Sequence, residues 1–187
     1  MLEQQIKQEL RAWSKHALES PSPFFNNLPA CPYAKKAWEE DKVGFVFKTE
    51  DDNLCLYQTI AGFDDRFEVI MVVDLSYKKD PEDFEDFIHD LNEAISEGIV
   101  GQQDVWVMGF HPDDDTDDLL GDGTFSPLVD EKYAIIFVQR LKSLHEKSKT
   151  LKAMGYYDRS FEVFENTDLY AHREELYRRL TNGDETP

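Results

Sequence analysis

The spacing of apolar residues predicts an amphipathic helix at the start of the chain. Apolar side chains recur every three or four positions over residues 2–19, at Leu2, Ile6, Leu10, Trp13 and Ala17, as one buried helix face requires. Pro21 and Pro23 end this helix, because proline lacks the backbone N–H that a helix interior uses. A loop rich in Pro and Asn follows, and Pro32 suits the first position of a short helix that reaches about Glu40.

Three strand-like runs come next. Val43–Thr49 places Val43, Phe45 and Phe47 on one face, which predicts a strand. Leu54–Ile60 is interpreted as a second strand, and Phe67–Leu75 is a mostly apolar run typical of a central strand. The connections between these runs are short, so we expect an antiparallel meander.

The best-defined helix lies in the middle of the chain. Asp80 is a suitable N-cap and Pro81 a suitable first residue. An apolar stripe follows at Phe84, Phe87, Ile88, Leu91, Ala94 and Ile95. Gly98 ends the helix. Val105–Phe110 and Tyr133–Gln139 are then predicted as strands, with an acidic loop between them.

Two more helices are predicted, from about Leu141 to Met154 and from about Asp168 to Leu180. The second should turn its apolar side chains inward, at Leu169, Leu176, Tyr177 and Leu180. This order of elements predicts an α+β fold, with a largely antiparallel sheet of about five strands and helices packed against it. No linker or repeat divides the chain, so residues 1–187 are expected to form a single domain with a flexible tail after about residue 181.

The charge of the chain restricts its partners. It carries 39 acidic and 20 basic residues, for a formal net charge of −19. This charge repels phosphate backbones and anionic membranes, so we expect neither a nucleic acid nor a membrane as partner. A basic protein partner would suit it. The 13 Phe, 8 Tyr and 3 Trp would fill a core or line a ligand pocket.

The start of the chain and its cysteines indicate a cytoplasmic protein. The first five residues form no apolar signal core. No run approaches the roughly 18 apolar residues of a membrane span. Cys31 and Cys55 are therefore expected to be reduced thiols. A homodimer is the default expectation for a small domain.

The first candidate for chemistry is Cys31-Pro32-Tyr33-Ala34-Lys35-Lys36. If Pro32 starts a helix, Cys31 lies at the N-cap, where the helix dipole and the nearby lysines would lower the pKa of the thiol. One interpretation is thus a reactive thiol at Cys31. The alternative is a half-buried cysteine that packs under the Pro-rich loop.

The second candidate is the segment from Gly109 to Asp118, at the end of a predicted strand. Imidazole and carboxylate ligands suit Fe, Mn or Zn, so we predict a metal at His111, Asp113 and Asp115. A calcium hand is not expected, because Asp118 stands where that motif has Gly. The alternative is a solvated acidic loop.

The third candidate is a basic stretch in an otherwise acidic chain. It comprises Arg140, Lys142, Lys147, Lys149 and Lys152, with His145 among them. Arg140 suits a substrate carboxylate, because its guanidinium binds carboxylates in bidentate fashion. His145 is the second candidate cofactor ligand after His111. The alternative is a solvated helix face.

Two of these segments resemble the motifs of an uncharacterised bacterial protein family. Its members share a C-P-F-A-K type motif, a later F-H-P motif and an arginine after an apolar run. Here these are Cys31-Pro32-Tyr33-Ala34-Lys35, Phe110-His111-Pro112 and Ile135-Ile136-Phe137-Val138-Gln139-Arg140, and the likeness covers roughly residues 28–155. Phe137 stands where that family usually has a histidine, and an Asn-Arg-Ser-Pro-Tyr stretch is missing. The resemblance groups the chain and implies no activity.

A second resemblance concerns small haem-dependent oxygenases that N-hydroxylate guanidino compounds. Their Pro-Cys-x-Phe-Ala type segment, followed by a strand with aromatic residues, is similar to Pro29-Ala30-Cys31-Pro32-Tyr33-Ala34 and Phe45-Val46-Phe47. This resemblance implies a haem cofactor and oxidative chemistry.

Three hypotheses for function follow. The first is an iron- or haem-dependent oxidative enzyme acting on a small molecule, with His111 and His145 as ligands, Cys31 in the pocket and Arg140 on the substrate. The second is a non-catalytic acidic protein that binds a basic partner through the loop over residues 111–123. The third is a thiol enzyme using Cys31. We favour the first, because the candidate residues fall at the ends of strands and helices.

Overall fold

The computed structural model describes residues 2–113, 125–159 and 168–183. Asp115 and the other acidic residues over 114–118 lie outside the described residues, as does the tail after residue 183. Within α7, the side chains of residues 168–170 and 183 are also outside the description, and the predicted inward position of Leu169 falls there.

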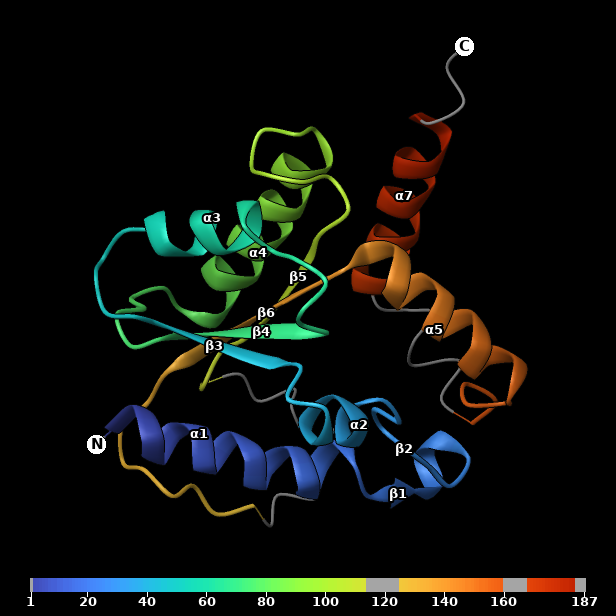
Figure 1. Cartoon of the computed structure of the whole chain (residues 1–187), viewed down its shortest axis with the longest axis horizontal. Helices are drawn as coiled ribbons and strands as arrows, with labels where there is room; N and C mark the ends of the chain where they lie inside the picture. Colours follow the sequence, from blue (N-terminus) through green and yellow to red (C-terminus); the bar gives the residue numbers. More distant parts are fainter. Residues whose placement is uncertain (1, 114–124, 160–167, 184–187) are drawn as a thin grey trace.

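A four-stranded mixed sheet forms the centre of the molecule (Figure 1). Its strands are β3 (Val43–Lys48), β4 (Val69–Asp74), β5 (Trp106–Phe110) and β6 (Ala134–Gln139), in the order β3-β4-β6-β5. The β3–β4 pair is parallel, whereas β4–β6 and β5–β6 are antiparallel. The α+β class is confirmed, and β3 and β5 are the two edges of the sheet.

The predicted five-strand antiparallel sheet is wrong at one element. Leu54–Ile60 is not a strand, because residues Leu54–Ala61 form helix α3. Leu56 and Ile60, four positions apart, are both fully buried, and the Asp52 carboxylate accepts a hydrogen bond from the backbone N–H of Leu54. This helix carries the chain across the sheet, so β3 and β4 run parallel instead of forming a meander.

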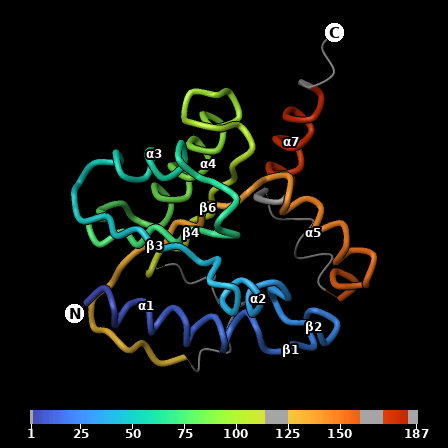
Figure 2. Tube along the Cα trace, viewed as in Figure 1, coloured from blue at the N-terminus to red at the C-terminus, as the bar shows by residue number. Residues whose placement is uncertain are grey.

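Helix α1 (Leu2–Trp13) covers one face of the sheet and continues into a π-helical segment, Ser14–Leu18. Its buried stripe, Ile6 and Leu10, packs against Met71, Val73 and Phe137. The tube in Figure 2 shows the helix lying along this face. The predicted helix over residues 2–19 is thus confirmed, with a change of helix type near its end.

Glu9 fastens α1 to the segment before β6. Its buried carboxylate accepts hydrogen bonds from the backbone N–H groups of Leu128 and Val129, the latter at 2.8 Å, and from the Tyr133 hydroxyl. A buried carboxylate with three donors is satisfied, as burial of a charge requires.

The opposite face of the sheet is covered by α3 and by α4 (Pro81–Ser96). Asp80 caps α4 as predicted, since its carboxylate accepts from the N–H of Asp83 at 2.9 Å. Asn92 joins α4 to β5 through two hydrogen bonds of 2.9 Å with the backbone of Val107. At Gly109 a Cβ would lie 2.5 Å from the Phe84 ring, so only glycine lets α4 approach β5 so closely.

The C-terminal helices α5 (Leu141–Ala153) and α7 (Asp168–Gly183) pack beside the sheet around Trp106, Leu141 and Leu176. The inward positions of Leu176, Tyr177 and Leu180 are confirmed. Helix α7 also contacts α4, which brings together segments that are far apart in the sequence. Among the described residues, no helix has the length and apolar character needed to span a membrane.

A small N-terminal unit completes the fold. A 3-10 turn at Pro23–Phe25 connects the two-residue strands β1 (Pro21–Ser22) and β2 (Leu28–Pro29), which pair antiparallel. Helix α2 (Ala34–Glu39) then leads into β3. The residues predicted as a loop and a short helix thus form these elements.

Candidate metal site between two helices

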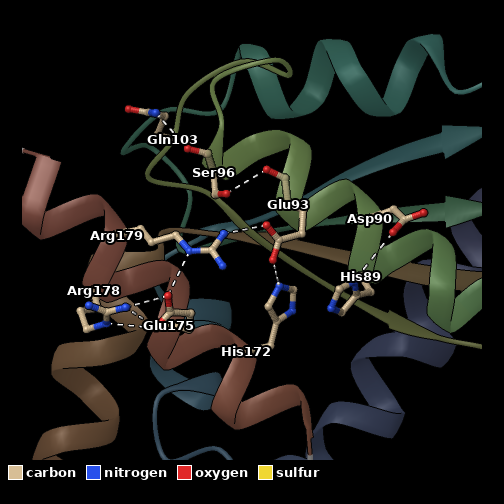
Figure 3. Close-up of polar contacts among 9 residues, drawn as sticks. All are labelled: His89, Asp90, Glu93, Ser96, Gln103, His172, Glu175, Arg178 and Arg179. Carbon is tan, nitrogen blue, oxygen red and sulfur yellow. Dashed lines mark hydrogen bonds and ion pairs between the residues drawn. The ribbon is translucent and has the colours of Figure 1, made fainter.

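Two histidines and a glutamate meet where α4 and α7 touch (Figure 3). His89 and Glu93 lie four positions apart on α4, so both project from one face of the helix. His172 approaches them from α7. One ligand atom from each residue lies within 4.8 Å of the other two, and among the described residues this is the metal-type cluster that the geometry identifies.

Glu93 is the centre of this cluster. Its Oε1 lies 2.8 Å from Nε2 of His172, and its Oε2 accepts from Nη1 of Arg179 at 2.8 Å. A carboxylate only accepts hydrogen bonds, so Nε2 of His172 carries the proton in this arrangement. Burial opposes ionisation of Glu93, but the hydrogen bonds from His172 and Arg179 outweigh it and lower the pKa of the carboxyl group.

The two imidazoles lie face to face. The ring centroids of His89 and His172 are 4.1 Å apart, with 17° between the ring planes. The buried Trp106 contacts His172 edge-on, at 5.7 Å between centroids. The three side chains differ in exposure. That of His172 is 11% exposed, that of Glu93 31% and that of His89 56%.

Two imidazole nitrogens and one carboxylate oxygen form a ligand set for a divalent transition metal. With metal–ligand bonds of about 2.0–2.2 Å, ligand atoms around one ion lie roughly 3.0–3.5 Å apart. The His172–Glu93 pair is already close, at 2.8 Å. His89 must tilt out of the stack, because a ring nitrogen binds a metal in the plane of its ring. Its exposure leaves it room to do so.

No family model, no curated protein and no solved structure matches this chain. The resemblances to the C-P-F-A-K family and to the haem-dependent oxygenases therefore stay predictions.

Sequence reasoning missed this cluster. The pattern His89-Asp90-Leu91-Asn92-Glu93 has the four-residue spacing that puts two ligands on one helix face, and this signal was available. His172 lies 79 positions beyond Glu93. No local pattern points to it, because only the docking of α7 on α4 brings it near.

His111 lies elsewhere, at the end of β5, with both ring nitrogens already bonded. Nδ1 accepts from the backbone N–H of Asp113 at 3.1 Å, so Nε2 carries the proton and donates to the Lys79 carbonyl at 2.9 Å. His111 is 5% exposed, and its ring packs against Tyr77 and Phe84. A metal or haem at His111 would have to break one of these bonds.

The carboxylates predicted beside His111 are accounted for only in part. The Asp113 carboxylate forms an ion pair with Lys132, whose hydrogen bond lowers the pKa of that carboxyl group. Asp115 lies outside the described residues. The predicted site at His111, Asp113 and Asp115 therefore stays a prediction.

Cys31 is not the N-cap of a helix. Helix α2 begins at Ala34, with Tyr33 as its capping residue, because the backbone makes a turn at Cys31 instead. The backbone N–H of Cys31 donates to the Leu18 carbonyl at 2.9 Å. Burial raises the pKa of the Cys31 thiol, and hydrogen bonds from the backbone at Tyr33 and Ala34 offset this only in part.

Arg140 and His145 both have protein partners. The Arg140 guanidinium lies over the Phe63 ring at 5.0 Å and donates to Asp65, Gln102 and the Phe63 carbonyl. His145 stacks on Tyr177, with centroids 3.6 Å apart. These contacts differ from those of Cys31 and His111, and among the described residues no hydrogen bond, ion pair or ring contact joins any two of the four predicted residues.

Proposed function

We propose that this protein binds one divalent transition-metal ion through His89, Glu93 and His172. The observation that carries the proposal is the approach of two imidazoles and an ionised carboxylate from two helices, with ligand atoms within 4.8 Å of one another. The lowered pKa of Glu93 supports it, because a metal ligand must be deprotonated.

The ligand set indicates what the metal would do. Two histidines and one carboxylate leave coordination positions open, and this combination is typical of non-haem iron sites that activate oxygen. We therefore keep the iron-dependent oxidative enzyme acting on a small molecule as the proposed activity, with the ligands moved from His111 to this cluster. The haem-dependent form stays a prediction that the contacts of His111 and His145 do not favour.

The surroundings define the roles of this chain's own residues. Trp106 supports His172 from the buried side. Arg179 holds the second oxygen of Glu93 and also donates from Nε to Glu175 at 3.1 Å. Binding of an ion would displace the Nε2 proton of His172 and reduce the hold of Glu93 on Arg179. Arg179 would then be available to an anionic group of a substrate.

The test is a titration of the purified, chelator-treated protein with Fe(II) under anaerobic conditions, and separately with Co(II), Ni(II) and Zn(II). Calorimetry gives the affinity and the stoichiometry, and the Co(II) absorption spectrum reports the ligand geometry. We expect about one ion per chain. His172→Ala and Glu93→Gln should each lower the affinity at least tenfold.

His145→Ala is the matched control. It removes a histidine that also contacts α7, through Tyr177 and Glu174, but lies outside the cluster. This variant should bind the ion as the wild type does. Absence of binding to the wild type, or equal losses in His145→Ala and His172→Ala, would overturn the proposal.

A second candidate function is recognition of a basic partner, favoured by the net charge of −19. Under this proposal the acidic loop over residues 111–123 forms the contact. Binding to a basic protein should weaken steeply with salt. It should be abolished when five aspartates of the loop are replaced by asparagine, at Asp113, Asp114, Asp115, Asp117 and Asp118. Retained binding in that variant would contradict the role of the loop.

A further inference from the structure

A groove runs along the exposed edge of β3, beside α1. Its volume is about 660 Å³, within the roughly 300–1,000 Å³ of ligand sites. Its apolar floor consists of Trp38, Val43, Phe45 and Phe67. Val43 and Phe45 pack toward α1, whereas Phe67 packs toward the α3–α4 side. The groove therefore reaches around the edge strand and includes its backbone.

The backbone of β3 directs hydrogen-bonding groups into this groove. The carbonyls of Lys42 and Lys48 accept from residues at the two ends of β4. Backbone direction alternates along a strand, so the even-numbered residues of β3 face β4. The N–H and C=O groups of Val43, Phe45 and Phe47 then point away from β4. No described residue pairs with these backbone groups on that side. Such an edge is a template for one more strand.

The wall of the groove is cationic, although the chain as a whole is strongly acidic. Lys7 and Arg11 of α1 and Lys15 of the π-helical segment after it recur every four positions and line the groove. Asp41 is the acidic residue in the lining. Arg11 is held by Glu19. Lys7 lies over the Phe45 ring, at 5.4 Å. In the part of the chain that the structure describes, neither Lys7 nor Lys15 forms an ion pair, although the charge of Lys15 helps to lower the pKa of the Glu19 carboxyl group.

We propose that this groove binds an extended acidic peptide segment of a partner protein, which adds to the sheet as a strand next to β3. Main-chain hydrogen bonds to Val43, Phe45 and Phe47 would supply affinity, as in other cases of strand addition. Alternate apolar side chains of the segment would lie on Trp38 and Phe45. Its carboxylates would pair with Lys7 and Lys15.

Charge explains why the segment should mix acidic and apolar residues. The formal charge of −19 repels a uniformly acidic chain at a distance. At physiological ionic strength this repulsion is screened over about 8 Å, so the nearby lysines dominate once the segment is in the groove. This proposal does not depend on the metal site, because none of the groove residues belongs to it.

The probe is a fluorescein-labelled ten-residue peptide that alternates glutamate and valine, measured by fluorescence anisotropy with the full chain. Two further forms of the peptide carry N-methyl groups on one or the other alternate set of amides. Only one set can face β3, so methylation of that set should lower the affinity at least tenfold while methylation of the other should not.

Charge reversal gives the matched pair of variants. Lys7→Glu/Lys15→Glu should lower the affinity for the glutamate–valine peptide at least tenfold. Lys149→Glu/Lys152→Glu makes the same change of charge on the exposed side of α5, outside the groove, and should have less than a threefold effect. Circular dichroism melting of both variants establishes that they are folded.

The proposal would be overturned if the peptide did not bind. It would also be overturned if the two double substitutions, or the two methylation patterns, changed the affinity equally. Sedimentation of the protein alone provides one more test. A dimer that dissociates in Lys7→Glu/Lys15→Glu would show that a second copy of this chain occupies the groove instead.

Discussion

His111, at the end of β5, and His172, at the interface between α4 and α7, have opposite kinds of surroundings. His111 is buried, and both of its nitrogens are bonded to backbone groups. His172 bonds a carboxylate and lies against a second imidazole that is largely exposed. The sequence motif predicted His111 as a metal ligand, whereas the arrangement of a carboxylate and two imidazoles favours His172 in that role. Residue type alone therefore does not distinguish a structural histidine from a candidate ligand.

The largest expected effect is a loss of stability in His111→Ala, which would show that His111 has a structural role. His111→Ala leaves the Lys79 carbonyl and the Asp113 N–H without partners and creates a cavity beside Tyr77 and Phe84. We expect the free energy of unfolding to fall by about 2–4 kcal/mol, measured by urea denaturation. Metal stoichiometry should stay the same wherever the variant is folded. Loss of the metal without loss of stability would reverse the comparison.

Cys31 extends the comparison to a thiol. Because burial raises its pKa, its reaction with iodoacetamide at pH 7.5 should be about tenfold slower than that of a cysteine in an unfolded peptide. Mass spectrometry of the alkylated peptides separates Cys31 from Cys55, and Cys31→Ser is the control. Fast alkylation with a midpoint below pH 8 would instead support the thiol enzyme.

Acidification should weaken the contact between α4 and α7 before it weakens the core. The folded-state pKa of Glu93 is lowered, so its contribution to stability is present above the ordinary value of 4.5 and is lost as the pH falls through the folded-state pKa. At pH 7 Glu93→Gln should cost about 1 kcal/mol or less, since the site is partly exposed. The difference in stability between the variant and the wild type should shrink as the pH falls below 4.5. A constant difference across this range would contradict the role of the ionised carboxylate.

The smallest expected effect concerns His89. Its side chain is 56% exposed, so His89→Ala should change the stability of the metal-free protein by no more than about 0.5 kcal/mol. The same variant should still lose at least tenfold in metal affinity. A large loss of metal affinity with little loss of stability would be the opposite of the result expected for His111→Ala. If His89→Ala left the metal affinity unchanged, the cluster would be a contact between two helices and not a metal site.

Several elements follow directly from local pattern. Asp80, Pro81 and the apolar stripe predicted α4, because a cap, a proline and a period of 3.6 residues agree with one another. The run Leu54–Ile60 was predicted as a strand but forms helix α3. A short apolar stretch fits a buried strand and a buried helix equally well, so the pattern could not distinguish them. The four-residue spacing of His89 and Glu93 is a local signal for two of the three candidate ligands, which sequence reasoning missed, and nothing local indicated His172.

The sequence by itself determined the acidity of this protein, its α+β composition and the positions of its main helices and strands. These depend on formal charge and on short-range periodicity, which are properties of neighbouring residues. The tertiary structure alone decided that β3 and β4 run parallel, that α7 places His172 against Glu93, and that lysines of the N-terminal helical segment line the β3 edge. Each of these joins residues distant in sequence, so it depends on how buried faces pack rather than on any local preference.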